Sequence, residues 1–138
     1  MPLRGFLFFV LPRIDRIIAL SAPIRIEVNM VYEMRTYWAA PGKTTAMHER
    51  FAQHTDALFR KHGMTVVAYW SPAGGRELHG DLVYVLGYAT QDARDAAWDA
   101  FRNDSAWQTA KAASERDGVL VEKIDSVILL PTAYSPMQ

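Results

Sequence analysis

The chain of 138 residues contains no cysteine. That absence excludes disulfide bonds, thiolate metal sites, iron–sulfur clusters and cysteine nucleophiles. An excess of charge is also absent, because 15 Lys and Arg side chains balance 15 Asp and Glu side chains. A balanced chain has no general electrostatic attraction for nucleic acid or for acidic membranes. We therefore predict that nucleic acid is not a partner of this protein.

Long apolar runs and clustered histidines are lacking as well. No run of about 18 uninterrupted apolar residues occurs, which predicts that no helix spans a membrane. The histidines form neither a His-x-His nor a His-Glu-x-x-His pair, so we predict no metal site. What remains is 50% apolar and 22% charged, which is the composition of one small globular domain.

Residues 1–29 differ in composition from the rest of the chain. They hold four arginines against two carboxylates, whereas residues 30–138 hold 11 basic and 13 acidic side chains. Charged residues interrupt the apolar stretch that a secretory signal would need. We interpret residues 1–29 as an N-terminal extension, with an early start-codon assignment as the hypothesis for its origin. Function is assigned to the domain of residues 30–138, and a cytoplasmic location is expected.

From residue 30 onward the hydrophobic periods alternate between those of strands and those of helices. A period of two with aromatic and β-branched residues predicts a strand, and apolar spacings of three and four predict a helix. Strands are predicted at 31–38, 64–70, 81–88 and 119–130, helices at 43–62, 91–102 and 105–116, and a loop at 71–80. This β-α-β-β-α-β order predicts a ferredoxin-like α+β domain, in which a four-stranded antiparallel sheet carries its helices on one face.

The face of the sheet opposite the helices needs its own cover. The predicted strands at 31–38 and 81–88 carry apolar or aromatic residues on both sides. A second copy of the chain is the simplest cover, since most soluble oligomers are closed homodimers. We therefore predict a homodimer.

Three polar residues alternate onto one face of the first strand: Glu33, Arg35 and Tyr37. Charged side chains on a central strand require partners. Two interpretations stay open. Glu33 and Arg35 form an ion pair in the core or at an interface, or Arg35 orients an anionic or carbonyl group of a substrate through its forked donors.

One histidine is expected to face the sheet. His54 shares the apolar face of the predicted helix with Met47, Phe51 and Leu58, whereas Arg50 falls largely elsewhere. An imidazole in that place is either a half-buried, hydrogen-bonded side chain or a functional base. The catalytic candidates are therefore His54, Arg35 and Tyr37.

The aromatic side chains also allow two interpretations. Trp70, Tyr84 and Trp98 are candidates for the core, where aromatic residues most often lie, and also for the wall of a pocket. Together with Glu33, Arg35, Tyr37 and His54, they are the candidate ligand-binding residues.

Several short segments, in this order and spacing, resemble the NIPSNAP family: Tyr32 to Tyr37, Pro41-Gly42-Lys43, Phe51-x-x-His54-Thr55, Lys61-His62-Gly63, Leu82 to Leu86, Ala96-Ala97-Trp98-x-x-Phe101 and Trp107. The resemblance covers about residues 30–131 and implies a dimeric α+β barrel, in which two ferredoxin-like sheets face each other. By the same resemblance, Glu33, Arg35, Tyr37 and His54 match recurring polar positions. Relatives by fold include cofactor-independent monooxygenases, muconolactone isomerase-like proteins and haem-binding proteins, and fold alone does not select among such activities.

Three hypotheses of function follow. The first is a pocket between the helix at 43–62 and the sheet that binds or converts a small apolar or aromatic molecule without a cofactor, with His54 as base and Arg35 polarising a carbonyl. The second is a non-catalytic homodimeric scaffold or partner-binding module. The third is a haem-binding protein with His54 as the iron ligand.

Overall fold

The computed structural model describes residues 29–138. The predicted extension therefore lies, except for its last residue, outside the described part of the chain and stays a prediction. The described residues form one four-stranded antiparallel sheet with the strand order β2-β3-β1-β4. Its strands are β1 (Val31–Ala39), β2 (Thr65–Trp70), β3 (Leu82–Tyr88) and β4 (Val121–Leu129). The predicted ferredoxin-like α+β arrangement is confirmed.

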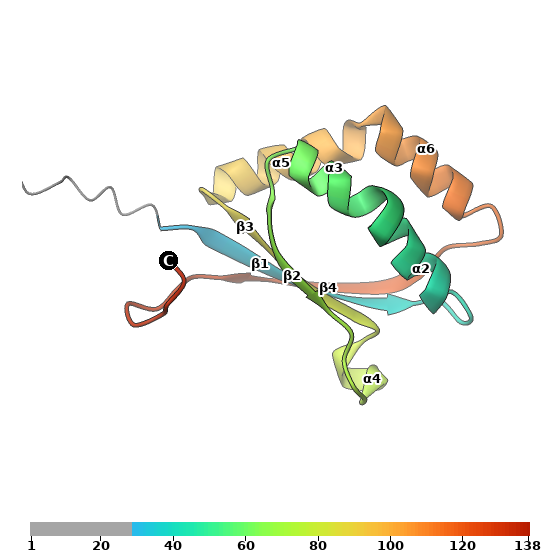
Figure 1. Ribbon diagram of the computed structural model, residues 1–138, viewed down its shortest axis with the longest axis horizontal. Helices are drawn as coiled ribbons and strands as arrows, with labels where there is room; N and C mark the ends of the chain where they lie inside the picture. The colour runs from blue at the N-terminus through green and yellow to red at the C-terminus, as the bar shows by residue number, and fades with distance from the viewer. Residues whose placement is uncertain (1–28) are drawn as a thin grey trace, which may run out of the picture.

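Helices cover one face of this sheet (Figure 1). The predicted helix at 43–62 is a continuous rod of three parts: α2 (Thr44–Arg50), a π-helical turn η1 (Phe51–Thr55) and α3 (Asp56–Lys61). The rest of this helical layer consists of α5 (Gln91–Asn103) and α6 (Ser105–Ser114). The segment predicted as a loop at 71–80 contains the short helix α4 (Arg76–His79), which lies on the other side of the sheet from the long helices (Figure 1).

Local capping explains where α5 and α6 begin. The Oγ1 atom of Thr90 accepts a hydrogen bond from the backbone N–H of Ala93 at 3.0 Å, as expected of a helix N-cap. Asp104 has an extended backbone between the two helices, and its Oδ1 atom accepts from the N–H of Ala106 at 2.8 Å. The chain therefore turns at Asp104, and α6 continues over the sheet toward β4.

Alternation along β1 places one set of side chains beneath the helices. Arg35 lies opposite Tyr84 of β3 and Ser126 of β4, and Tyr37 lies opposite Leu82 and Ile124. Glu33 shares this face, because side chains two apart on a strand point the same way. The core between this face and the helices is largely aromatic, with Tyr37, Phe51, Phe59, Tyr84, Tyr88, Trp98 and Phe101 among its buried members.

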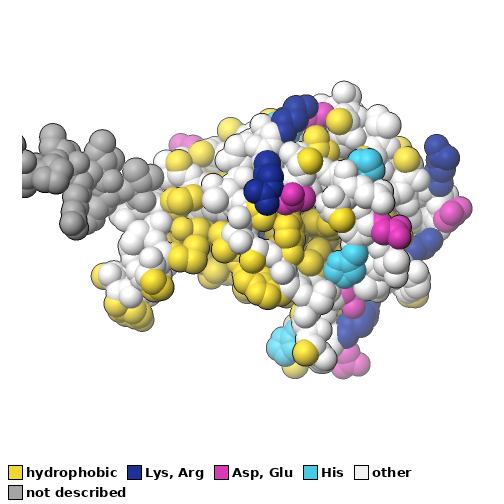
Figure 2. All heavy atoms as spheres, viewed as in Figure 1, with side chains coloured by type: hydrophobic (Ala, Val, Ile, Leu, Met, Phe, Trp, Pro, Cys, Tyr) yellow, Lys and Arg dark blue, Asp and Glu magenta, His cyan; other side chains and the backbone are white. Residues whose placement is uncertain are grey.

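The opposite face of the sheet leaves apolar side chains in contact with solvent. Trp70 is 50% exposed, Val127 is 45% exposed and Leu129 is 40% exposed. Figure 2 shows hydrophobic side chains gathered below the helical layer. We call this face, with Met34, Val67, Trp70, Val85, Val127 and Leu129, the open face. Among the helices of residues 29–138, none combines the length and hydropathy that a membrane crossing requires.

Candidate functional site

A single buried carboxylate organises the polar part of the core. Glu33 is fully buried, and both of its oxygens accept hydrogen bonds from surrounding donors. The donors to Oε1 are Tyr88 Oη at 2.8 Å, Trp98 Nε1 at 2.9 Å and Arg94 Nε at 3.3 Å, and those to Oε2 are Ser126 Oγ at 2.5 Å, Arg94 Nη2 at 2.6 Å and Arg35 Nη1 at 3.0 Å. The guanidinium groups of Arg35 and Arg94 and the indole of Trp98 can only donate, so the arrangement favours the ionised form of the carboxylate.

The environment of Glu33 changes its pKa in two opposing ways. Burial raises the pKa of the carboxyl, whereas the hydrogen bonds from Arg94, Ser126, Tyr88 and Trp98 lower it, and the balance leaves the pKa at about 2 instead of 4.5. Because the folded chain binds this proton more weakly than the unfolded chain, the ionised carboxylate stabilises the fold above about pH 4.5.

We expect a specific part of the acid sensitivity to come from Glu33. As the pH falls from about 4.5 toward 2, the stability that its lowered pKa provides, about 3 kcal/mol, is lost. A carbon-13 NMR titration of the Glu33 carboxyl should show no inflection above about pH 3. A midpoint near 4.5, the ordinary pKa of a glutamate, would contradict this role for the hydrogen-bond network.

Arg35 connects the carboxylate to a tyrosine pair. Its guanidinium lies 4.3 Å from the centroid of the Trp98 ring, and its Nη2 atom donates to Tyr37 Oη at 3.4 Å. Tyr84 is fully buried and donates to the same Tyr37 oxygen at 2.9 Å. Burial raises the pKa of Tyr84 well above its ordinary value, which keeps that hydroxyl a donor. The Nε atom of Arg35 is buried and has no hydrogen-bond partner within residues 29–138.

A second arginine, which is buried, comes from the helical layer. Arg50 is 6% exposed and its Nη1 atom donates to Ser114 Oγ and to Glu115 Oε1, both at 3.2 Å. Its guanidinium lies 5.1 Å from the ring centroid of Trp107. Its Nε atom is also buried without a partner in the described part of the chain. The expectation that Arg50 lies away from the buried face is wrong, because α6 packs over that side of α2 and encloses the side chain.

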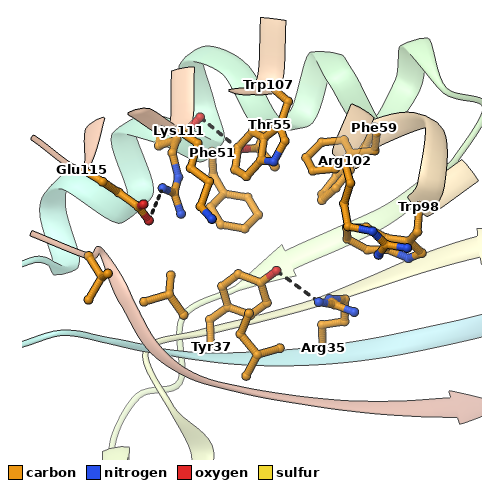
Figure 3. A pocket seen from close by; sticks show the side chains of 15 residues that line it. Arg35, Tyr37, Phe51, Thr55, Phe59, Trp98, Arg102, Trp107, Lys111 and Glu115 are labelled. Carbon is orange, nitrogen blue, oxygen red and sulfur yellow. Dashed lines mark hydrogen bonds and ion pairs between the residues drawn. The ribbon is translucent and has the colours of Figure 1, made fainter. Parts of the chain in front are cut away.

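Both arginines line a cavity of about 300 Å³ between the sheet and the helices. Figure 3 shows Tyr37 and Arg35 rising from the sheet toward Phe51, Thr55 and Trp107 above them. The helix-side cavity, as we call it, is lined by Arg35, Tyr37, Arg50, Phe51, Thr55, Phe59, Trp98, Phe101, Arg102, Trp107, Lys111, Glu115, Val119, Val121 and Ile124. Its walls are therefore mainly aromatic and aliphatic, and four of its five charged side chains are cationic.

The structure brings some of the predicted ligand-binding residues together. Arg35, Tyr37 and Trp98 line the helix-side cavity. Glu33 and Tyr84 do not line it, but they hold Arg35, Trp98 and Tyr37 through the hydrogen bonds described above. The ion pair between Glu33 and Arg35, expected as one of two interpretations, is present at 3.0 Å.

The two other predicted residues lie elsewhere. His54 is exposed and does not line the cavity, so the expectation that it faces the sheet is wrong. The π-helical turn is wider than a turn of α-helix, and it places Thr55 on the buried side in place of His54. The Oγ1 atom of Thr55 donates to the carbonyl of Arg50 at 3.3 Å. Trp70 belongs to the open face. Regular helical periodicity contains no signal for such an inserted residue.

A second hollow lies on the other side of η1. It has a volume of about 440 Å³ and is lined by His48, Phe51, Ala52, Asp56, Arg60, Tyr69 and Leu82. Its polar groups bond to one another, because Asp56 accepts from Arg60 Nε at 3.1 Å and from Tyr69 Oη at 2.8 Å. The buried donors that lack partners lie instead at the helix-side cavity, which makes that cavity the stronger candidate site.

The helix-side cavity does not fit the predicted haem ligation. No histidine lines it, and His54, the predicted iron ligand, lies outside it. No group of three or more His, Asp or Glu side chains within residues 29–138 is placed to hold a metal ion. The chemistry of this lining is that of aromatic contacts and guanidinium donors.

Fold and site together define a ferredoxin-like α+β domain that encloses an aromatic, cationic cavity between its sheet and its helices. The model of the NIPSNAP family matches residues 32–136, and the chain belongs to that family. The resemblance seen in the sequence is therefore confirmed. None of the curated proteins matches this chain.

Solved NIPSNAP structures share the fold. A NIPSNAP family protein from Agrobacterium tumefaciens is 25% identical, with a TM-score of 0.68 over 79% of this chain and 99% of that one. A second protein of the family from the same organism, of unknown function, is 22% identical, with a TM-score of 0.68 over 81% and 96%. An uncharacterized NIPSNAP-like domain protein from Burkholderia xenovorans is 21% identical, with a TM-score of 0.66 over 78% and 90%.

Proposed function

We propose that the helix-side cavity binds a small apolar or aromatic molecule. The observation that carries this proposal is a hollow of about 300 Å³ whose wall combines aromatic side chains with two arginines, Arg50, which is buried, and Arg35, whose side chain is 13% exposed. Ligand pockets commonly begin at about this size, and they combine apolar walls with a few fixed polar groups. Each buried donor without an acceptor lowers the stability of the fold by about 1–3 kcal/mol. A core that served packing alone would therefore gain nothing from such arginine donors.

Arg35 and Tyr37 supply the polar contacts of the proposed site. Tyr37 Oη accepts hydrogen bonds from Tyr84 and Arg35. These two bonds occupy both acceptor positions of the Tyr37 hydroxyl, so its proton is available for donation to a ligand. Arg35 is held on two sides by Glu33 and the Trp98 ring. Two fixed donors on an apolar wall suit the carbonyl or hydroxyl oxygen of a bound molecule, and they orient it in the cavity.

Filling the cavity should abolish binding. In a thermal-shift screen of aromatic and aliphatic metabolite-like compounds, at least one compound should bind the wild type. At a concentration of about a hundred times its Kd, that compound should raise the free energy of unfolding by about 2.7 kcal/mol. Val121→Trp or Ile124→Trp, which places an indole among the lining residues, should lose that stabilisation. Ala112→Trp, on the exposed side of α6, is the matched control and should keep it. An unchanged shift in both filled variants would contradict the proposal.

We also infer that the open face is covered by a second copy of the chain. The supporting observation is the row of half-exposed apolar side chains that includes Trp70, Val127 and Leu129. Contiguous apolar patches on a folded chain mark interaction sites. A scaffold that binds a different partner would use the same face, and a solution mass of about twice the 15.6 kDa chain separates the homodimer from it.

A further inference from the structure

The lining of the helix-side cavity carries an excess of positive charge. Four cations, Arg35, Arg50, Arg102 and Lys111, face one carboxylate, Glu115. Carboxylates outside the lining offset part of this excess. Glu33 pairs with Arg35 and with Arg94, Arg94 also pairs with Asp95, and Asp99 pairs with Arg102 at the exposed rim. Among the residues that the structure describes, Lys111 has no ion-pair partner, so a bound anion would be attracted to this space.

Arg50 has the most suitable free donors for such an anion. Its Nη1 atom is occupied by Ser114 and Glu115, whereas its Nε and Nη2 atoms bond to no residue within 29–138. The Nε–Nη2 edge of a guanidinium is one of the edges that hold a carboxylate through two parallel hydrogen bonds. Arg35 differs, because its Nη1 atom already serves Glu33 and its Nη2 atom serves Tyr37.

The surroundings of Arg50 define the rest of the ligand. Trp107 lies against its guanidinium, and Phe51 follows it directly in the chain and lines the same cavity. Lys111 lies one helical turn after Trp107 in α6 and lines the cavity as well. A molecule with an aromatic body and one anionic end would satisfy both the apolar wall and the arginine. A neutral molecule without an acceptor at this end would leave the Nε atom of Arg50 buried and without a partner.

We propose that the ligand of the helix-side cavity is an aromatic or aliphatic monocarboxylate whose carboxylate binds the Nε–Nη2 edge of Arg50, after a rotation of the guanidinium toward the cavity. This inference rests on the proposed function and narrows it from apolar molecules in general to carboxylic acids. A hydrogen bond between charged groups contributes about 1.5–3 kcal/mol, which corresponds to about tenfold to a hundredfold in affinity.

A matched pair of probes tests the inference. Calorimetric titration at pH 7 compares 3-phenylpropanoate with 3-phenylpropanamide, which has nearly the same shape and no charge. The wild type should bind the acid at least about tenfold more tightly than the amide. Arg50→Met should remove that preference, and Arg50→Lys, which keeps the charge without the fork, should retain only part of it.

Arg50→Met leaves Glu115 without its partner and lowers stability, so the double variant Arg50→Met/Glu115→Gln repeats the measurement with both charges removed. Loss of the acid preference in the double variant supports the inference. Equal binding of the two probes by the wild type would overturn the inference and leave the proposed function intact. A preference for the acid that survives in the double variant would also overturn it, and so would binding of neither probe, whereas the thermal-shift screen decides on the proposed function.

Discussion

Replacing Glu33 by glutamine is expected to lower the free energy of unfolding by about 3–5 kcal/mol, which is the usual cost of breaking a buried ion pair. Glutamine has the same shape as glutamate, but its amide nitrogen is itself a donor and would face the donors that surround one of the two Glu33 oxygens. Glu33 is the acceptor in all six hydrogen bonds, so the substitution removes acceptors, leaves Arg35 without a compensating charge and leaves Arg94 with Asp95 as its remaining carboxylate partner. For a domain of this size, the melting temperature should fall by about 15–30 °C.

Two variants calibrate that result. Glu77→Gln makes the same chemical change at an exposed position of α4 and should shift stability by less than about 0.5 kcal/mol. Ser126→Ala removes one of the donors to Glu33 and should cost about 1 kcal/mol, which keeps the test informative if Glu33→Gln does not fold. A Glu33→Gln variant as stable as the Glu77→Gln control would show that the network does not hold the core together.

The Val127→Glu variant is expected to be a monomer. Val127 lies in the second half of β4 on the open face, opposite Met34 of β1, and it is 45% exposed in the single chain. A carboxylate there costs little in an isolated chain, but in a homodimer each copy would be buried against the partner. Burying an unpaired charge costs several kcal/mol, so the dimer Kd should rise at least about a hundredfold.

Analytical ultracentrifugation measures this effect. Ala112→Glu adds the same charge on the exposed side of α6 and should leave the dimer intact. A wild-type chain that sediments as a monomer, or a Val127→Glu chain that stays dimeric, would contradict the assignment of the open face as the interface.

Strand periodicity was sufficient to predict half of the candidate site. Because side chains alternate strictly along β1, the sequence predicted that Glu33, Arg35 and Tyr37 share a face, and the structure places all three beneath the helices. The element order was sufficient for the ferredoxin-like fold, since its helices and strands are long and separated by glycine and proline signals.

The other half of the site depends on features that local patterns do not contain. The π-helical turn rotates His54 out of the buried face and brings Thr55 in. Arg50 is buried only because Ser114 and Glu115, 64 and 65 residues later, pack over it. A charged residue on a helix is normally exposed, and only the path of α6 reverses that expectation.

The aromatic residues show the same limit. In the sequence, Trp98 and Tyr84 allow the same two interpretations, core or pocket wall, yet Trp98 lines the cavity and Tyr84 lies behind Tyr37. Trp70 ends the edge strand on the open face. Which aromatic residue faces an empty space depends on how closely the opposite layer packs, and periodicity carries no information about that distance.

Methyl chemical-shift mapping tests the central claim, that the helix-side cavity is a binding site, most directly. Addition of 3-phenylpropanoate to the methyl-labelled wild type should shift the signals of Val119, Val121 and Ile124, which line the cavity. The signals of Val67, Val85 and Val127 on the open face should stay unchanged. Shifts confined to the three valines of the open face would contradict the claim. The absence of any shift at a saturating concentration would contradict it as well.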